Sequence, residues 1–439
     1  MTTAPPADPR SLLADLYSAA TAAVAPGPAL RGRLEGLSLG DVPDRICVIA
    51  LGKAAIPMAD AAVQYLRASK RRLAGGLVIG PAVRGLENSP LPYRQGDHPE
   101  PGPASFAAAE ALARAVAEIP PDAEVWVLLS GGTTSLVGAP EAGLTTEELS
   151  AIYGLLLSSG LEITAMNRIR KRFSRWGGGK LARALAPARV RVYIVSDVIG
   201  DDLASIGSGP CVPDPTTAAE VRHLLENSGL WSRIPDSARA MIHSAETGAS
   251  PETPKPGDEA FLNVGSEVIA SNHLALEAAR DRAVELGMAP LLIGEPIVGE
   301  AAAVGTRIAS ELLGSCHRSA GQSASRCFIW GGETTVTLGG SAGMGGRCQE
   351  LALAAARGFN QAGESLALLA AGTDGRDGPT DAAGAIVDAS TWSAIARAGR
   401  DPATDLAYHN AYYALDAAGA LLRPGLTGTN VMDVVIGIC

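Results

Sequence analysis

Residues Arg45–Leu51, with the sequence RICVIAL, decide the fold class of this chain. The run is short, apolar and rich in β-branched residues, and Gly52, Lys53 and an alanine-rich stretch over Ala54–Arg67 follow it at once. Such a run is typical of a strand buried on both faces, and the alanine-rich stretch is typical of a helix. A strand that turns directly into a helix is the first half of a βαβ unit, so we expect a parallel sheet.

The same alternation of strand and helix continues along the chain. Further strands are expected over Gly76–Ile79, Glu124–Leu129 and Val190–Val195, and helices over Ser11–Val24, Ala104–Ala117 and Thr145–Leu157. A second series of strands is expected near Asn263–Ala270, Leu291–Ile293, Cys327–Trp330, Thr334–Leu338, Ala367–Ala371 and Met432–Ile438. The pattern therefore predicts an α/β fold throughout.

A change of composition separates the two series. Thr247–Gly257 (TGASPETPKPG) combines proline, glycine, serine and charged residues, as linkers and exposed loops do. A chain of 439 residues has room for two domains of ordinary size. We therefore predict a Rossmann-like domain with a parallel sheet over residues 1–246, and a second three-layer α/β/α domain with a mixed sheet over residues 258–439.

Charge and composition narrow the class of partner. The formal net charge of −10 argues against a general surface for nucleic acid or for an anionic membrane. An anionic substrate would therefore need a local basic pocket. No apolar run approaches the ~20 residues that span a bilayer, and the N-terminal stretch lacks the basic start of a signal peptide. We expect a cytoplasmic protein.

The cysteines give the same indication of compartment. They are Cys47, Cys211, Cys316, Cys327, Cys348 and Cys439. No two of them form a C-x-x-C pair, and in a chain of this length their spacing is not that of a disulfide framework. We therefore expect them to fit a reducing compartment.

Residues that directly follow strands are the candidates for chemistry, because ligands of open α/β sheets bind beyond the carboxyl ends of the strands. Gly52 and Lys53 follow the first strand and precede a helix, whose N-terminus attracts anions. The segment is not a Walker A loop, because Cys47 occupies the first glycine position and Ala54 follows the lysine. A surface lysine near a helix cap would give the same pattern.

Two further strand ends carry polar residues. Ser130, Gly131 and Gly132 lie in LLSGGTTS after the predicted strand Glu124–Leu129, where backbone amides and hydroxyls can bind a phosphate or carboxylate. A tight turn with a helix cap is the alternative. Asp197 follows the strand that ends at Val195, where a general base or a metal ligand would project. Asp201 and Asp202, a few residues later, fit caps of the following turn.

The densest candidate lies in the second series. Gly331–Glu333 precedes a glycine-rich loop, Gly339–Gly346, which ends at Arg347 and a predicted helix over Cys348–Ala356. A glycine-rich loop that feeds a helix N-terminus with an arginine at the junction is a phosphate cradle in physical terms. It is not the dinucleotide fingerprint, which opens the first βαβ unit. A hairpin tip is the alternative interpretation.

Acidic and basic clusters complete the candidates. Asp374, Asp377 and Asp381 lie in GTDGRDGPTD after a predicted strand and offer the hard oxygen ligands that Mg²⁺ prefers. A series of Asp/Gly turns is the alternative. The run Arg168–Arg175 is strongly basic and reads either as a solvated helix face or as the border of an anion pocket.

The motifs together resemble one known family. They are ALGKAA (Ala50–Ala55), GDHPEPG (Gly96–Gly102), SGGTTSL (Ser130–Leu136), SDVIGDDLASIGSGP (Ser196–Pro210), GGETTVT (Gly331–Thr337), GGRCQELALAAA (Gly345–Ala356), AAGTDGRDGPTDAAGA (Ala370–Ala385) and TGTNVMD (Thr427–Asp433). In this order they resemble the glycerate 2-kinase family, whose C-terminal part is called the MOFRL domain. Some members carry the older label of hydroxypyruvate reductase.

The resemblance implies a kinase that uses ATP and Mg²⁺ to phosphorylate D-glycerate at its C2 hydroxyl, in a cleft between two α/β domains. It implies catalytic roles for Lys53, Asp197 and Arg347. The residues expected to bind substrate or phosphate are Ser130, Gly131, Gly132, Glu333, Gly345, Gly346 and Asp374, and Asp381 is the candidate metal ligand. The expected partners are glycerate and ATP, without nucleic acid or membrane, and the expected assembly is a homodimer.

One departure from the family pattern concerns a lysine. The family usually has Lys-Gly-Gly where this chain has Gly177, Gly178 and Gly179, so Arg175 or Lys180 must replace that lysine or its role is lost. Two other classes of protein compete with the kinase. A hydroxypyruvate reductase would need a nicotinamide site, and a phosphosugar-binding module would explain SGGTTS but not the residues proposed for catalysis.

Overall fold

Two compact units make up the structure, a computed structural model that describes residues 8–38, 43–81, 90–317, 325–339, 343–360 and 366–439. One unit is continuous in sequence, Pro26–Ile269, and we call it the central unit. The other combines the chain up to Ala25 with Ala270–Cys439, and we call it the flanking unit. The chain thus passes from the flanking unit into the central unit and back again.

The central unit is built on a sheet with the strand order β3-β2-β1-β4-β5-β6. The strands are β1 (Arg45–Leu51), β2 (Arg72–Gly80), β3 (Tyr93–Gln95), β4 (Glu124–Leu129), β5 (Val190–Val195) and β6 (Val264–Ala270). β1 runs parallel to β2 and to β4, and the pairs β2/β3 and β4/β5 are parallel as well. This is the order of the Rossmann fold.

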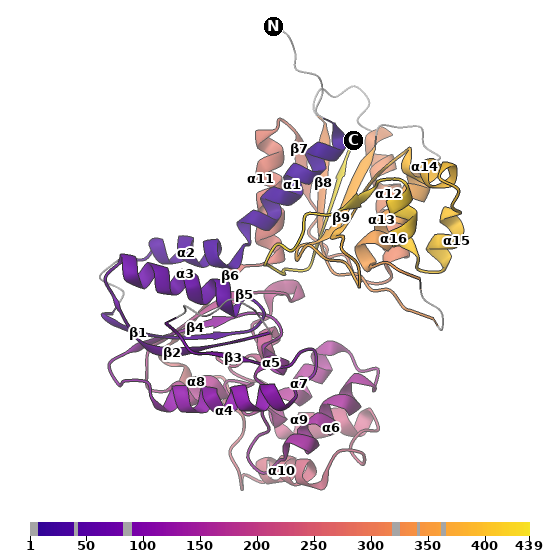
Figure 1. The fold of residues 1–439 in the computed structure, drawn as a ribbon. Helices are drawn as coiled ribbons and strands as arrows, with labels where there is room; N and C mark the ends of the chain where they lie inside the picture. The colour runs from indigo at the N-terminus through magenta and orange to yellow at the C-terminus, as the bar shows by residue number, and fades with distance from the viewer. Residues whose placement is uncertain (1–7, 39–42, 82–89, 318–324, 340–342, 361–365) are drawn as a thin grey trace. The chain divides into compact units, whose positions relative to one another are not determined.

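Helices cover both faces of this sheet (Figure 1). On one face lies α3 (Ala55–Ala68) with α2 (Pro26–Glu35) beside it, and on the other lie α4 (Pro103–Ala117) and α8 (Lys180–Leu185). Burial from both sides explains why β1 and β4 are continuous apolar runs instead of alternating ones. A separate apolar cluster holds α6 (Thr146–Leu157), α7 (Ile163–Phe173), α9 (Ala218–Asn227) and α10 (Asp236–Glu246).

The flanking unit has a mixed sheet with the order β11-β10-β9-β12-β8-β7. The strands are β7 (Ala289–Leu292), β8 (Arg326–Gly332), β9 (Ala367–Gly372), β10 (Gly384–Asp388), β11 (Leu421–Leu422) and β12 (Asp433–Ile438). β7 is parallel to β8, and the other pairs are antiparallel. The last strand of the chain therefore lies inside its own unit, between β8 and β9.

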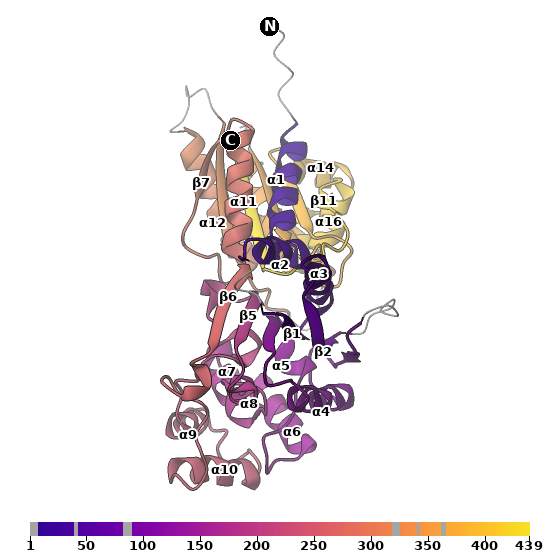
Figure 2. The ribbon, with the colours of Figure 1, turned by 90° about the vertical axis from the view of Figure 1, so that its left-hand side faces the viewer.

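Two layers of helices enclose this second sheet. α1 (Pro9–Ala23) and α11 (Asn272–Glu285) pack side by side on one face (Figure 2). The other face carries α12 (Ala301–His317), α13 (Arg347–Phe359), α14 (Thr391–Arg397), α15 (Pro402–Ala407) and α16 (Ala411–Ala417). The predicted fold class, two α/β domains with one parallel and one mixed sheet, is confirmed.

The division of the chain differs from the predicted ranges 1–246 and 258–439. α1 belongs to the flanking unit, where Asp15 pairs with Arg282 at 2.7 Å and the Tyr17 hydroxyl donates to the Gly372 carbonyl at 2.8 Å. β6 is the edge strand of the central sheet, so the loop Thr247–Gly257 lies within the central unit. Both differences arise from contacts between segments that are far apart in the sequence.

One predicted strand and the prediction about the cysteines are wrong. Over Thr334–Leu338 only Thr335 forms an isolated bridge, to Glu300, because the chain leaves the sheet after Gly332, whose φ is +136°. Cys316 and Cys439 form a disulfide with Cα atoms 5.9 Å apart, which a sequence separation of 123 residues does not reveal. None of the helices in the described ranges has the length and apolar character needed to cross a membrane.

Candidate functional site

The turns after β1 and β4 meet where the strand order of the central sheet reverses. Ligands of open α/β sheets bind at this switch point. The Lys53 amide donates to the Gly131 carbonyl at 2.9 Å, and the Ala54 amide donates to Ser130 Oγ at 3.0 Å. A Cβ on Gly52, whose φ is +114°, would overlap Ser130 Oγ, so the two turns approach closely only because this residue is glycine.

Ser130 holds these turns together. Its buried hydroxyl accepts from Ala54 and donates to the Leu51 carbonyl at 3.3 Å. The Oγ atom is therefore engaged within the protein instead of being presented to a ligand. This geometry assigns Ser130 a supporting place in the site, and leaves Gly131 and Gly132 as the surface of the turn.

Asp197 and Lys53 lie against these two glycines. A Cβ on Gly131 would overlap Oδ2 of Asp197, and a Cβ on Gly132 would lie 3.2 Å from both Cγ and Cε of Lys53. Burial raises the pKa of Asp197, and the positive charge of Lys53 opposes this rise. In the described part of the chain neither the ammonium nor the carboxylate has an ion-pair partner within 4.0 Å. Both groups are available to a ligand.

The loop that begins with Asp197 is fixed to the turn after β4. Asp202 accepts from the Ala204 amide at 3.1 Å and from the Ser205 hydroxyl at 2.6 Å, which is the predicted turn cap. Further along, the hydroxyls of Thr134 and Ser208 share a hydrogen bond of 2.8 Å. These bonds keep the loop after β5 in place beside Gly131.

The basic run is mostly internal, and the solvated-face interpretation is wrong for its centre. Lys171 and Arg172 are buried, and Arg172 pairs with Glu252. Lys180 Nζ donates to the Ser174 carbonyl at 2.6 Å and lies 2.5 Å from a carboxylate oxygen of Glu141. Arg175 pairs with Glu110 at 2.6 Å. Both residues proposed to replace the family lysine are thus engaged in contacts within the protein.

Arg347 opens α13 in the flanking unit and is held by two carboxylates. Its Nε and Nη2 atoms donate to Asp433 at 2.6 and 2.7 Å, and Nη1 lies 2.9 Å from Glu333 Oε1. The Asp433 side chain is only 1% exposed. Burial lowers the pKa of Arg347, but the hydrogen bond to Asp433 and the negative charges of Asp433 and Glu333 act together against it and hold the pKa above its ordinary value.

The predicted phosphate cradle at the start of α13 is filled by Asp377. Its carboxylate accepts from the Cys348 amide at 3.2 Å and from the Gln349 amide at 2.8 Å. A Cβ on Gly346 would overlap this carboxylate. Burial raises the pKa of Asp377 to about 7, although the bond from Gln349 opposes the rise. Gly346 therefore makes room for a side chain of the protein itself, whereas a Cβ on Gly345 would lie 3.4 Å from the Ala411 amide nitrogen; positions 340–342 lie outside the described residues.

Asp374 and Asp381 do not form one metal site. Asp374 accepts from the Arg376 amide at 2.9 Å in the turn after β9. Asp381 is exposed and accepts from Tyr412 at 2.8 Å and from Arg423 at 3.2 Å. Among the described residues, no group of three or more His, Cys, Asp or Glu is placed to hold a metal ion. The position of Asp381 in a surface ion pair speaks against it as a metal ligand.

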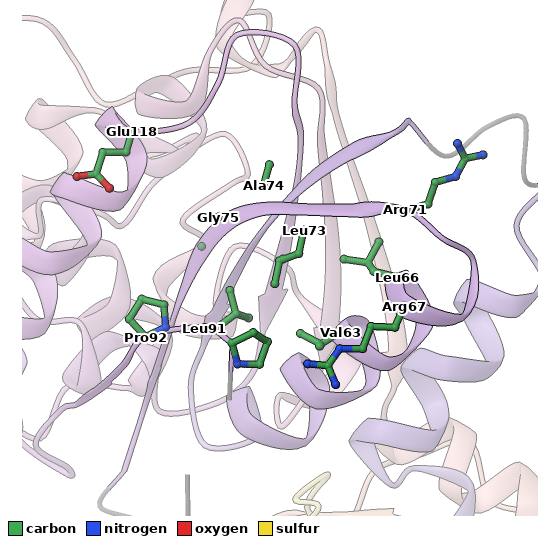
Figure 3. A pocket seen from close by; sticks show the side chains of 12 residues that line it. Val63, Leu66, Arg67, Arg71, Leu73, Ala74, Gly75, Leu91, Pro92 and Glu118 are labelled. Carbon is green, nitrogen blue, oxygen red and sulfur yellow. The ribbon is translucent and has the colours of Figure 1, made fainter. Parts of the chain in front are cut away.

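A cavity of about 530 Å³ lies elsewhere in the central unit (Figure 3). It is bounded by the first half of β2, by α3 and by Leu91 and Pro92, with Arg67 and Glu118 at its walls. It contains none of the predicted site residues and does not lie at the carboxyl ends of the strands. We therefore place the candidate site at the turns after β1 and β4 and not in this cavity.

Comparison with known families defines the class of protein first. Residues 12–243 match the model described as "Domain of unknown function (DUF4147)", and residues 326–433 match the MOFRL family. The chain therefore contains both modules, and together they cover most of its length.

Individual relatives are more specific. The chain is 37% identical to the glycerate 2-kinase of Pyrococcus horikoshii over 91% of this chain and 88% of that protein. It is 36% identical to a putative hydroxypyruvate reductase of Agrobacterium vitis over 97% and 93%. The crystal structure of a glycerate kinase from Thermotoga maritima superimposes with a TM-score of 0.87 and 34% identity, covering 98% of this chain and 99% of that one. The chain belongs to the glycerate 2-kinase family.

Proposed function

We propose that the protein transfers the γ-phosphoryl group of ATP to the C2 hydroxyl of D-glycerate, which gives 2-phosphoglycerate and ADP. The observation that carries the proposal is the convergence of Lys53 and Asp197 on the Gly131–Gly132 turn, at the switch point of a Rossmann-type sheet. Among the described residues neither side chain has an ion-pair partner within 4.0 Å. The Pyrococcus relative is named a glycerate 2-kinase and the Thermotoga structure a glycerate kinase, and both names support phosphorylation of glycerate.

Phosphoryl transfer needs positioning and neutralised charge more than covalent help from the protein. Asp197 would accept the proton of the glycerate hydroxyl or aim its lone pair at phosphorus. Lys53 would offset negative charge on the transferring group. It also favours the ionised form of Asp197, whose pKa burial raises. The two side chains therefore support each other's role.

Arg347 is the third residue in the proposal. A guanidinium carries five N–H donors, and the contacts to Asp433 and Glu333 use three of them. Within the described residues, two donors remain for an anionic ligand. The carboxylates fix the plane of the guanidinium, so we propose that they orient Arg347 as well as balance its charge.

A divalent metal is part of the proposal because ATP is normally used as its Mg²⁺ complex. Mg²⁺ keeps several waters and usually takes one or two protein carboxylates together with the substrate phosphates. We propose Asp374 for this role because it lies in the turn after β9, at the end of a strand, whereas Asp381 lies in an exposed ion pair with Arg423. The metal would supply charge neutralisation at the phosphates.

Reduction of hydroxypyruvate, the activity in the older label, is the second candidate function. The sequence of the turn after β1 argues against it. Dinucleotides bind this sheet order through a G-x-G-x-x-G turn, whereas the chain has Gly52, Lys53 and three apolar residues there. A lysine at this position is suited to bind a phosphoryl group, and binding of a nicotinamide cofactor does not require it.

A coupled assay tests both the reaction and its regiochemistry. The purified protein, ATP, Mg²⁺ and D-glycerate are mixed with enolase but without phosphoglycerate mutase. A substrate carboxylate held by cations fixes the adjacent C2 hydroxyl, and fixed alignment supplies much of the rate. Phosphoenolpyruvate should therefore appear at once. Its appearance only after mutase is added would mean phosphorylation at C3, and NADH consumption with hydroxypyruvate but no ADP would mean a reductase.

Compartment and assembly complete the proposal. We place the enzyme in the cytoplasm, where ATP is available. The buried free thiols of Cys47, Cys211, Cys327 and Cys348 are compatible with this placement, whereas the Cys316–Cys439 disulfide is unusual for a reducing compartment. A homodimer is supported by the open edge at β7, where Leu291 is 47% exposed. Light scattering should give twice the mass of the chain.

A further inference from the structure

The segment Gly96–Gly102 (GDHPEPG) lies at the same edge of the central sheet as Lys53. The Gly96 amide donates to the Gly80 carbonyl, at the end of β2, over 3.0 Å. A Cβ on Gly96 would overlap the backbone of Leu136, at the end of the short helix α5 (Thr133–Leu136). The segment therefore lies between the end of β2, which is the neighbour of β1, and the helix that follows the Gly131–Gly132 turn.

Asp97 locks the segment in place. Its Oδ2 atom accepts from the Ala104 amide at 2.8 Å and from the Ser105 amide at 3.2 Å, in the first turn of α4. Its own amide donates to the buried hydroxyl of Ser105 at 2.8 Å. With Gly96 and Asp97 both fixed, the backbone of His98 has a defined position.

The His98 ring faces the candidate site. A Cβ on Gly132 would lie 3.2 Å from His98 Cδ2 and 3.2 Å from Lys53 Cε, so the ring and the lysine flank the same glycine. Asp197 lies against the neighbouring Gly131. In the ranges that the structure describes, the ring forms no hydrogen bond or ion pair with the protein. A third polar side chain without a partner thus borders the turn.

We propose that His98 is a substrate-binding residue of the Lys53–Asp197 site and that its ring N–H donates a hydrogen bond to a carboxylate or phosphoryl oxygen of a bound substrate. The proposal rests on the kinase function proposed above. Partial desolvation, with the charge of Lys53, lowers the pKa of His98. At neutral pH the ring is therefore uncharged and offers one donor and one acceptor.

Steady-state kinetics on two variants distinguish the substrates. His98→Ala removes the donor, and His98→Asn keeps an N–H group at similar reach. A hydrogen bond to a charged group is lost in His98→Ala, so the KM of one substrate should rise about 10-fold or more. A rise for glycerate identifies the carboxylate, and a rise for ATP identifies a phosphoryl oxygen. His98→Asn should recover part of the loss, and His243→Asn, on the exposed side of α10, should change nothing.

A binding measurement on the wild-type protein does not depend on turnover, and a variant is needed only to assign the signal. The ¹⁵N resonances of the histidine rings are recorded with glycerate alone and with a non-hydrolysable ATP analogue alone, and His98 is assigned by its loss in His98→Asn. One of the two ligands should shift the His98 signal. If wild type releases no ADP, the kinase function fails. If wild type is active, but the His98 signal is unmoved by either ligand and His98→Ala keeps kcat and both KM values within two-fold, the inference about His98 is overturned.

Discussion

At the scale of single residues, the candidate site depends on two glycines as much as on the charged groups. Gly131 and Gly132 present bare backbone, and Asp197, Lys53 and His98 occupy the space that side chains would otherwise fill. The protein thereby brings a carboxyl group, an ammonium group and an imidazole to one turn without an ion pair between them. The carboxyl and ammonium groups are available to bind a ligand through their charges, and the imidazole through its ring nitrogens.

The first prediction concerns Gly131→Ala. The added methyl group would overlap Oδ2 of Asp197 and push the carboxylate aside. Displacement of a reacting group by about 1 Å can cost ~10²-fold, so kcat should fall by about that factor while the melting temperature changes little. Gly154→Ala is the matched control, because nothing lies within 4 Å of a Cβ there. Equal activity of the two variants would remove Asp197 from the reaction.

A second prediction concerns Lys53→Met. Loss of one preorganised donor should lower turnover by ~10²–10³-fold. Lys53 favours the ionised form of Asp197, so its removal should raise the pKa of Asp197 further. If Asp197 acts as the base, the acid limb of the residual kcat/KM profile should move to higher pH. Lys70→Met, on an exposed residue after α3, should leave both the rate and the profile unchanged.

At the scale of elements, the start of α13 is a closed arrangement instead of an open anion site. Asp377 caps its amides, while Asp433 at the start of β12 and Glu333 after β8 hold Arg347. A carboxylate from the protein satisfies a helix N-terminus as a phosphate would. The donors left for a ligand are therefore on the Arg347 side chain.

The third prediction separates structure from chemistry at this helix. Arg347→Met leaves Asp433 buried without its partner, which should cost on the order of 3 kcal/mol of stability as well as activity. Adding Asp433→Asn removes the unpaired charge, so the double variant should regain much of the stability in urea unfolding. Its turnover should stay low, because the arginine is still missing. Turnover restored together with stability would show that Arg347 acts only on the fold.

The sequence predicts the strands well where helices cover both faces of the sheet. β1, β4 and β5 were predicted to the residue, because parallel strands covered on both faces are unbroken apolar runs with sharp polar ends. Lys53 and Asp197 were singled out as sites by the same logic of strand ends. The segment Thr334–Leu338 has the alternation of a strand, but it pairs only through the isolated bridge of Thr335 to Glu300, and alternation alone does not show this.

The remaining parts of the candidate site depend on contacts across the sequence. Asp433 is 86 residues from Arg347 in the sequence, and Asp377 is 28 residues from Gln349, whose amide it binds. No local sequence pattern predicts such pairs. The sequence therefore predicts a free N-terminus for α13, and this prediction fails because the distant side chain of Asp377 binds the amides there.

At the scale of the whole molecule, the central unit is inserted into the chain of the flanking unit. α1 buries Leu13, Leu16 and Tyr17 in that unit. Burial of a large apolar side chain contributes roughly 1.5–3 kcal/mol, and a domain is stable by only ~5–15 kcal/mol. The first helix is thus a substantial part of the stability of the flanking unit.

The fourth prediction follows from this division. Ala270–Cys439 expressed alone should lack a cooperative unfolding transition. The same fragment with Asp8–Ala25 joined through a Gly/Ser linker should unfold cooperatively in circular dichroism. A fused control with Leu13→Asp and Leu16→Asp should behave like the fragment alone. A cooperative transition in the bare fragment would contradict the assignment of α1 to this unit.

The insertion also determines how long α1 waits for its partner helix during synthesis. α1 leaves the ribosome early, but its partner α11 is made only after the whole central unit. At roughly 5–20 residues per second, the interval is on the order of tens of seconds. Throughout it the apolar face of α1 has no native partner, while the continuous central unit can fold. Nascent chains stalled before residue 270 should therefore crosslink to chaperones through α1, and completed chains should not.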